Sequence, residues 1–281
     1  MSKPEILLAG AYPDWDMADL NERYSVHKYW DISDKAAFLA KTGPAIRGIA
    51  TRGELGASAE LMRQLPALEI VSCYGVGTDA IDLNYARAHG ITVTNTPDVL
   101  TEDVADIAIG LLLAAARHIP QGDQFVRGGL WGKQAMPLVT RVSGKRLGIV
   151  GMGRIGQAIA KRMQGFGCDI RYFATSAKPD LPFTFEPDLL QLATDSEFLI
   201  VIVPGGEKTK NIINAGVLAA LGPDGIIVNV SRGSTMDETA LIEALTKGAI
   251  KSAGLDVFWN EPAINPVFFT MPNVVLHPHH G

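Results

Sequence analysis

The run Arg-Leu-Gly-Ile-Val-Gly-Met-Gly-Arg-Ile-Gly at residues 146 to 156 most constrains what this chain can fold into. Leu147 to Val150 have the pattern of a buried strand, and apolar residues at helical spacing follow the glycines: Ile155, Ala158, Ile159 and Met163. Gly151 permits a tight turn, Gly153 lets the backbone approach a pyrophosphate, and Gly156 lets the helix pack close to the strand. The strand, turn and helix N-terminus together predict a dinucleotide site, whereas the glycines alone also occur in turns that bind nothing.

Composition limits the class of protein. The 281 residues are 47% hydrophobic, which suffices for about two packed domains. The formal net charge of -5 argues against nucleic acid or an acidic membrane surface as a partner. Two cysteines, Cys73 and Cys168, cannot build a disulfide framework, and no signal peptide or membrane-spanning run is recognisable. We therefore expect a cytoplasmic protein that acts on a small molecule.

The first part of the chain alternates short β-rich runs with helical or turn segments. The expected strands are Ile6 to Ala9, Tyr24 to His27, Ile46 to Ala50, Leu68 to Cys73 and Ile91 to Val93. This alternation predicts a parallel α/β unit. The loop from Tyr74 to Asp79 follows a strand, where open α/β sheets bind ligands, although a plain glycine turn explains the same residues.

A crossing to a second domain is expected at Asn95-Thr96-Pro97-Asp98, where proline and turn formers end the strand pattern. A long helix starting at Thr101 should follow, with an apolar core-facing stripe of Val104, Ile107, Ala108, Leu111, Leu112 and Ala115. Residues 121 to 144 are expected to form an irregular connection that is unusually apolar. It packs either against a partner subunit or back on its own domain.

After the glycine turn, further strands are predicted with helices between most of them. They are Asp169 to Ala174, Glu197 to Val203, Gly225 to Val230, Ser252 to Leu255 and Val274 to Leu276. Asp237 should cap one of the helices and Gly248 should end it. The pattern predicts a doubly wound sheet.

Residues able to do chemistry lie beyond the carboxyl ends of these strands. They are Arg232, Asp256, Glu261 and His279, and each also has an ordinary structural explanation when taken singly. His277, His279 and His280 fall within four positions, but no cysteine or carboxylate cluster is spaced to complete a metal site with them. We therefore expect no metal. A histidine after a strand in a dinucleotide protein is better interpreted as a proton donor or acceptor.

The motifs in this order resemble the D-isomer-specific 2-hydroxyacid dehydrogenases. The resemblance rests on the 151–156 turn, Asn229-Val-Ser-Arg-Gly-Ser, Gly254-Leu-Asp-Val-Phe, Glu261-Pro and Pro278-His279, and it extends to Tyr74–Asp79, Asn95-Thr96-Pro97 and Thr101-Glu-Asp-Val-Ala. From Arg127 through Lys178 and Pro179 the chain looks most like glyoxylate and hydroxypyruvate reductases. The resemblance implies a flavodoxin-like α/β substrate domain in residues 1–97 and a Rossmann-type cofactor domain in residues 98–281.

The resemblance also implies roles for individual residues. Arg232 would hold the substrate carboxylate and carbonyl, since its planar fork suits that task. His279 would protonate the carbonyl oxygen as hydride attacks the carbon, and Glu261 would keep its imidazole protonated. The amides of Val76 and Gly77 would grip the carboxylate, and Asp256 would accept from the nicotinamide carboxamide. The rest of the implied cofactor site comprises Gly151, Gly153, Arg154, Ile155, Gly156 and Pro204 together with the 175–178 loop.

The loop after the second cofactor-domain strand bears on the choice of dinucleotide. NAD enzymes usually place an acid there, which accepts from the ribose hydroxyls. Residues 173 to 178 offer no acid, whereas the hydroxyls of Thr175 and Ser176 and the charge of Lys178 can receive a 2′-phosphate. We therefore predict NADP(H) over NAD(H). Related NADP-dependent reductases often carry arginine where this chain has Thr175, so the discrimination should be modest.

Members of this family continue past the catalytic histidine with a helix that returns to the first domain, so we expect residues beyond Gly281. We also expect a homodimer through the 101–144 region. The predicted activity is reduction of glyoxylate, hydroxypyruvate or a related 2-keto acid to the D-2-hydroxy acid. Alternatives are a 2-ketogluconate reductase, a D-lactate or phosphoglycerate dehydrogenase, and a non-enzymatic cofactor sensor on the same scaffold.

Overall fold

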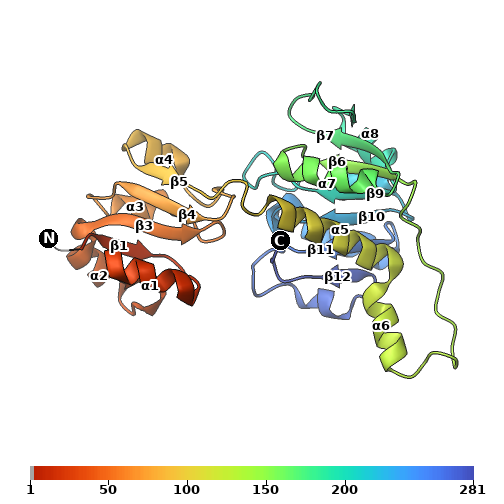
Figure 1. The fold of residues 1–281 in the computed structure, drawn as a ribbon, viewed down its shortest axis with the longest axis horizontal. Coiled ribbons are helices and arrows are strands. Elements are labelled where there is room, and N and C mark those ends of the chain that lie inside the picture. The colour runs from red at the N-terminus through yellow and green to blue at the C-terminus, as the bar shows by residue number, and fades with distance from the viewer. Residues whose placement is uncertain (1–2) are drawn as a thin grey trace. The chain divides into compact units, whose positions relative to one another are not determined.

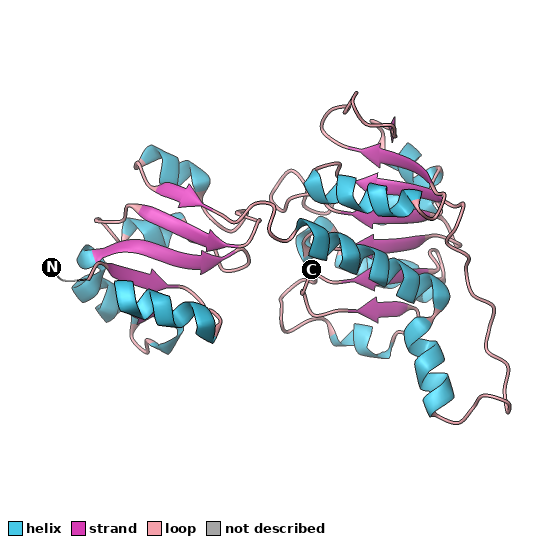
Figure 2. Ribbon diagram, in the orientation of Figure 1, coloured by secondary structure: helices cyan, strands magenta, loops and turns pink. Residues whose placement is uncertain are grey.

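The computed structural model describes residues 3–281 and divides the chain into two compact units. The first unit ends at Leu100 and the second begins at Thr101, close to the boundary expected after Pro97. Figure 2 shows that both units combine strands with flanking helices. The α/β fold class predicted from the alternation is confirmed.

The first unit is built on a five-stranded sheet in the order β2-β1-β3-β4-β5, in which all neighbours are parallel. Its strands are β1 (Glu5–Leu8), β2 (Ser25–Lys28), β3 (Ile46–Arg52), β4 (Ile70–Tyr74) and β5 (Thr92–Thr94). Its helices are α1 (Asp14–Arg23), α2 (Lys35–Thr42), α3 (Ala59–Arg63) and α4 (Leu83–Ala88) (Figure 1). The strand order is that of flavodoxin-like folds, as the resemblance implied.

The second unit holds a seven-stranded parallel sheet in the order β12-β11-β10-β9-β6-β7-β8. Its strands are β6 (Arg146–Val150), β7 (Asp169–Phe173), β8 (Thr184–Phe185), β9 (Phe198–Val201), β10 (Ile226–Asn229), β11 (Ser252–Leu255) and β12 (Val274–Leu276). Its helices are α5 (Thr101–Arg117), α6 (Ile119–Arg127), α7 (Arg154–Gln164), α8 (Leu189–Thr194), α9 (Ala215–Leu221) and α10 (Glu238–Lys247). Because β6 pairs with both β9 and β7, the chain reverses its winding at β6, which makes this a Rossmann-type doubly wound sheet.

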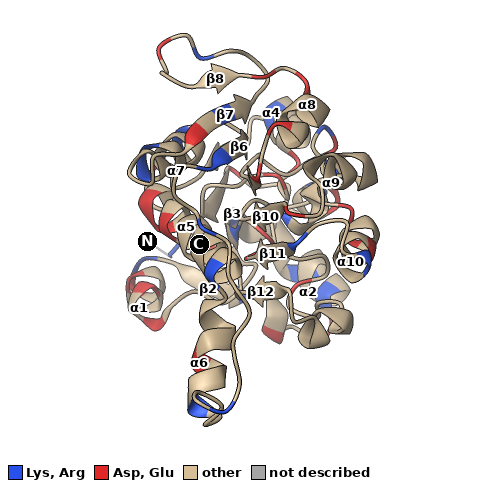
Figure 3. Cartoon of the chain, turned by 90° about the vertical axis from the view of Figure 1, so that its right-hand side faces the viewer, with Lys and Arg blue, Asp and Glu red and all other residues tan. Residues whose placement is uncertain are grey.

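Helices cover both faces of the second sheet, so its central strands are wholly buried. Figure 3 shows α5 and α7 on one side and α8, α9 and α10 on the other. The α5 stripe is buried as predicted, except that Ile107 is half-buried. At the rim, Arg162 of α7 binds the carboxylates of Glu102 and Asp106 of α5, each at 2.7 Å. The apolar stripe and this charged rim fix α5 and α7 against each other.

Both predicted ends of helix α10 are confirmed. The side chain of Asp237 accepts from the Ala240 amide, and Gly248 closes the helix in the left-handed conformation with φ of 68°.

Two features of the second unit differ from expectation. The short edge strand β8 was not predicted, because two residues leave almost no pattern in the sequence. The irregular connection expected at 121–144 is wrong for its first part, since α6 extends to Arg127. Pro120 in the first turn suits a helix start, because its missing N–H has no partner there in any case.

Four short 3-10 helices complete the described elements: Tyr29–Asp31, Gly43–Ala45, Gly233–Thr235 and Pro266–Thr270. Within residues 3–281, none of the helices is both long and apolar enough to traverse a bilayer.

Candidate active site

The glycine turn between β6 and α7 has a different geometric reason for each glycine. Gly151 has φ of 109°, and a Cβ there would lie 2.2 Å from the Ile202 carbonyl oxygen. A Cβ on Gly156 would lie 2.1 Å from the Gly151 carbonyl oxygen, so the helix reaches the strand only through glycine. A Cβ on Gly153 would meet nothing within 4 Å. The fold therefore requires the outer two glycines, whereas Gly153 leaves open space.

That open space lies at the N-terminus of α7. Gly153 is the N-cap residue, and no side chain caps the helix. The first-turn amides, those of Arg154, Ile155 and Gly156, thus carry the positive end of the helix dipole beside open space. Such a site accepts a pyrophosphate, and its place at the sheet's switch point is where dinucleotides bind. The residues present fit a dinucleotide.

The loop after β7 has its polar side chains in solvent and is hydrogen-bonded to the strand. Thr175, Ser176 and Lys178 are exposed, and the Lys178 amide donates to the buried Tyr172 hydroxyl at 2.6 Å. The role of Tyr172 was not foreseen, because a strand tyrosine in a sequence looks like core. Two further predicted cofactor residues are also exposed: Arg154 at the start of α7, and Pro204 in the loop after β9.

Arg232 lies on a turn that is stabilised by internal hydrogen bonds. The Asn229 side chain, at the end of β10, donates to the Arg232 carbonyl at 3.1 Å and accepts from the Ser231 amide. The Thr235 hydroxyl donates to the same Arg232 carbonyl at 2.7 Å. Asn229 and Thr235 are almost wholly buried, so this turn is rigid. Sequence reasoning missed both residues, although an Asn two residues before a turn amide is a recognisable local motif.

Glu261 and His279 are brought together from loops 18 residues apart in the sequence. Nδ1 of His279 donates to Oε2 of Glu261 at 2.5 Å, and the Phe258 amide donates to Oε1 of Glu261 at 2.6 Å. Both carboxylate oxygens are therefore oriented, and Nε2 of His279 is the ring nitrogen left for another partner. The hydrogen bond expected between Glu261 and His279 is present.

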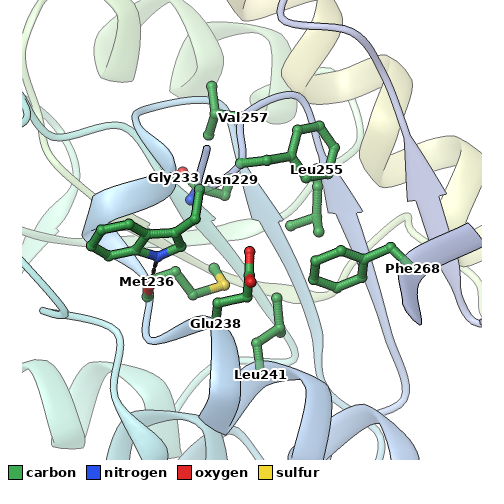
Figure 4. A pocket seen from close by; sticks show the side chains of 10 residues that line it. Asn229, Gly233, Met236, Glu238, Leu241, Leu255, Val257 and Phe268 are labelled. Carbon is green, nitrogen blue, oxygen red and sulfur yellow. Dashed lines mark hydrogen bonds between the residues drawn. The ribbon is translucent and has the colours of Figure 1, made fainter. Parts of the chain in front are cut away.

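The turn of Arg232 and the loop of Glu261 touch through Gly233. A Cβ on Gly233 would lie 2.1 Å from the Phe258 carbonyl carbon, so only glycine admits the loop this closely. Behind the contact lies a small, mostly apolar pocket, lined in part by Met236, Leu255 and Phe268 (Figure 4). Trp259 borders this pocket and donates from Nε1 to the Met236 carbonyl at 2.9 Å. The loops that carry Arg232 and Glu261 are thus held together at Gly233 and by the hydrogen bond between Trp259 and Met236.

The environment of His279 favours its charged form. The hydrogen bond to Glu261 is the largest influence and raises the pKa of His279 above its ordinary value, with further help from the charges of Glu261 and Asp256. Burial and the positive charge of Arg232 act in the opposite direction without cancelling the effect. His279 therefore holds a proton to higher pH than a free histidine does, as a proton donor in a reduction must.

Asp256 is almost wholly buried, and protein groups occupy both of its oxygens. Oδ1 accepts from Nδ1 of His277 at 2.7 Å and from the His280 amide at 3.0 Å, while Oδ2 accepts from the Gly281 amide at 3.0 Å. Contact with a nicotinamide carboxamide stays a prediction. What the structure places here is an anchor for the segment that carries His279.

In the first unit, the 74–79 loop follows β4 and is tied down by its carbonyl groups. The Val76 carbonyl accepts from the Asn95 side chain at 2.9 Å, and the Gly77 carbonyl accepts from the thiol of Cys73 at 3.3 Å. The Gly75 amide donates to Thr96. The hydrogen bonds described for Val76 and Gly77 thus use their carbonyl oxygens to fix the loop. This arrangement suits a loop whose main-chain amides donate to a ligand.

Comparison with known proteins supports what this geometry suggests. The family model described as the NAD-binding domain of D-isomer-specific 2-hydroxyacid dehydrogenases matches residues 109–281, more than half of the chain. The chain belongs to the D-isomer-specific 2-hydroxyacid dehydrogenase family. It is thus an oxidoreductase of this family, and the resemblance stated from the motifs is confirmed.

Three relatives illustrate the family members that the chain is similar to. Glyoxylate/hydroxypyruvate reductase A of Arabidopsis thaliana is 44% identical over 94% of this chain and 84% of its own length. The 2-ketogluconate reductase of Gluconobacter oxydans is 45% identical over 99% of this chain and 88% of its own. The crystal structure of an NADPH-dependent glyoxylate/hydroxypyruvate reductase from Sinorhizobium meliloti, in complex with NADP and malonate, has a TM-score of 0.89 at 44% identity, covering 99% of this chain and 86% of that one.

Gly153 and Gly156 of this dehydrogenase turn give a first prediction. Gly156→Ala places its Cβ against backbone, so it should destabilise the protein by about 1–3 kcal/mol and lower the Tm. Gly153→Ala should leave the free energy of unfolding within about 0.5 kcal/mol of wild type, since nothing in the protein meets its Cβ. It should nevertheless weaken NADPH binding about tenfold or more by filling the phosphate space. Thermal unfolding and NADPH titration check this, and unchanged NADPH affinity in Gly153→Ala contradicts the pyrophosphate site.

The Glu261–His279 pair gives a second prediction. With His279 as the proton donor, kcat/KM for keto-acid reduction should hold at low pH and fall as the pH rises through the raised pKa of His279. Glu261→Gln removes the main cause of that raised pKa, so the falling limb should move to lower pH. The measurement is the pH profile of kcat/KM for both proteins. A limb at the same pH in both shows that Glu261 does not set the protonation of His279.

Proposed function

We propose that this dehydrogenase reduces a small 2-keto acid, glyoxylate or hydroxypyruvate, to the D-2-hydroxy acid with NADPH. The observation that carries the proposal is the grouping of Arg232, Glu261 and His279 on facing loops of the dinucleotide-binding unit. Relatives named for these two substrates cover nearly the whole chain. A cofactor sensor needs the dinucleotide site but has no use for a proton donor and a carboxylate clamp, so the grouping argues against a sensor.

The dinucleotide supplies a hydride when bound, and the side chains supply the rest. Arg232 binds the substrate carboxylate through its planar fork and turns the keto oxygen toward His279. Nε2 of His279 donates the proton to that oxygen, and Glu261 stabilises the imidazolium before transfer. His279 must regain a proton from solvent before the next turnover.

A preference for NADP(H) is supported by the 174–178 loop. Thr175, Ser176 and Lys178 are exposed there, and residues 174–178 contain no carboxylate that would repel a 2′-phosphate. The Sinorhizobium meliloti relative, which is described as NADPH-dependent, agrees with this preference. Cys73 and Cys168 are not joined in a disulfide, which is compatible with the reducing cytoplasm that we propose as its location.

A second substrate class is supported by one relative. The similarity to 2-ketogluconate reductase extends over 99% of this chain, which makes a sugar acid the next candidate.

The function is tested by following reduced nicotinamide absorbance with glyoxylate, hydroxypyruvate, pyruvate and 2-ketogluconate. We expect turnover of glyoxylate or hydroxypyruvate with NADPH, and weaker use of NADH. His279→Ala and Arg232→Ala should each lower kcat/KM by about 100-fold or more with the fold intact. Near-normal turnover in either variant contradicts the assigned roles, and NADPH binding without turnover of any keto acid favours a sensor.

Lys178→Ala refines the cofactor assignment within the same assay. It should lower the NADPH-to-NADH ratio of kcat/KM about tenfold by removing the charge for the 2′-phosphate. Lys247→Ala is the matched control, because Lys247 pairs with Glu243 on the exposed face of α10.

We further propose that the protein is a homodimer through the arm surface, defined as Ile119, Val126, Trp131 and Leu138. These side chains are between 53% and 97% exposed on α6 and the segment after it, which is unusual for large apolar groups so close in sequence. A second copy of the chain is the occupant we infer, since the surface is apolar and carries no site chemistry. The exposure of the arm surface supports packing of the 121–144 stretch against a partner subunit, rather than back on its own domain.

Sedimentation equilibrium tests the arm surface. Wild type should sediment as a dimer, and Val126→Asp with Leu138→Asp should give monomers, because a charge at a desolvated interface is costly. Leu190→Asp on α8, about half exposed, should stay dimeric. A monomeric wild type contradicts the proposal.

A further inference from the structure

The histidines at 277, 279 and 280 make different hydrogen bonds in the structure. His279 binds Glu261, whereas His277 binds Asp256 through Nδ1 at 2.7 Å. His280 contributes its main-chain amide to Asp256, and its side chain is exposed. The proposed role of proton donor accounts for His279 alone, which leaves His277 to be explained.

His277 and Asp256 occupy equivalent positions on neighbouring strands. Asp256 follows β11 and His277 follows β12, and Leu255 and Leu276 are paired in the sheet. The His277 amide donates to the Leu255 carbonyl at 2.9 Å, and the Asp256 amide donates to the Asn229 carbonyl at 3.0 Å. The main chain thus holds both residues in register with β10, the strand that leads to Arg232.

The segment that follows His277 is a tight turn in an uncommon conformation. The His279 amide donates to the His277 carbonyl at 3.1 Å, and His279 itself has φ of 55°. A residue with a Cβ adopts this left-handed region only when its surroundings hold it there. The surroundings here are the Asp256 carboxylate, which accepts from the amides of His280 and Gly281 just after the turn.

The Asp256 side chain is only 2% exposed, so its orientation depends on its partners. Oδ1 has two described donors, Nδ1 of His277 and the His280 amide, and the imidazole is the only side chain among the donors described for this carboxylate. Without the imidazole, the Oδ1 atom of a buried carboxylate keeps a single described donor. A buried carboxylate that loses a donor reorients or is displaced toward water.

We propose that His277 is a positioning residue for the reduction, which fixes the Asp256 carboxylate so that it pins the turn carrying His279. This rests on the proposed function for its effect on turnover. His277 acts through Asp256 and the amides of His280 and Gly281. The left-handed turn then presents Nε2 of His279 in one orientation while Glu261 holds the opposite ring nitrogen.

The kinetic test compares two substitutions of His277 in the full chain. His277→Leu removes the donor to Asp256 and should lower kcat for hydroxypyruvate about tenfold, because a displaced proton donor slows the chemical step. KM for hydroxypyruvate should change less than about threefold, since Arg232 makes the carboxylate clamp. His277→Asn keeps an N–H close to the Nδ1 position and should restore kcat to within about threefold of wild type.

His280→Leu is the matched comparison, because it removes the neighbouring imidazole but keeps the main-chain amide that donates to Asp256. Its loss in kcat should be smaller than that of His277→Leu. Equal losses of kcat in the two variants overturn the proposal. The packing of the two imidazole rings, rather than the bond from His277 to Asp256, would then hold the turn. Failure of His277→Asn to restore kcat, or a rise in KM without a fall in kcat, overturns it as well.

Hydrogen exchange of the His280 and Gly281 amides tests the anchor without any turnover. Both amides should be protected in wild type and in His277→Asn, and should exchange faster in His277→Leu. Unchanged protection in His277→Leu overturns the proposal. If wild type reduces none of the 2-keto acids, the proposed function fails, but this exchange result still decides whether His277 anchors the turn.

Discussion

The hydrogen bond between Nδ1 of His279 and Glu261 is the interaction on which the rest of this site depends. It fixes the ring, leaves Nε2 toward the reacting side and raises the pKa of His279, so that one contact determines both geometry and protonation. Neither residue lies in a strand or helix. Their positions must therefore come from the strand ends and the turns that connect them.

The doubly wound sheet supplies those positions by placing each functional residue just beyond a parallel strand. Arg232 follows β10, Asp256 follows β11 and His277 follows β12, and these three strands are neighbours. Small residues then let the loops approach: Gly233 admits the Phe258 backbone, and Gly156 admits α7 against the glycine turn. The same sheet edge thus carries the cofactor anchor at one point and the proton donor at another.

Much of this could be predicted from the sequence because parallel strands are continuous apolar runs. Ser252 to Leu255 and Val274 to Leu276 were predicted to the residue, the second with Pro272-Asn273 before it and Pro278 after it. The two-residue strand β8 left no pattern in the sequence. Helix α6 was not predicted, because none of its apolar residues is buried and they do not form the stripe typical of a helix that packs on its own core.

The candidate catalytic residues could be proposed from the sequence, but not the residues that hold them. Arg232, Glu261 and His279 carry chemistry that their residue types reveal. Asn229, Thr235 and Tyr172 act through side-chain hydrogen bonds to main-chain groups, and such bonds depend on turn conformations that sequence spacing does not specify. The bond between His277 and Asp256 joins residues 21 positions apart and could be recognised only once β11 and β12 were paired.

If His279 already carries the proton used in reduction, a single-turnover experiment will show it. The protein is saturated with NADPH in weak buffer containing a pH indicator, at a pH below the raised pKa of His279, and mixed with hydroxypyruvate. NADPH oxidation should precede proton uptake from solvent in the first turnover, and His279→Ala should abolish this fast phase. Proton uptake simultaneous with oxidation, or a fast phase that persists in His279→Ala, would contradict it.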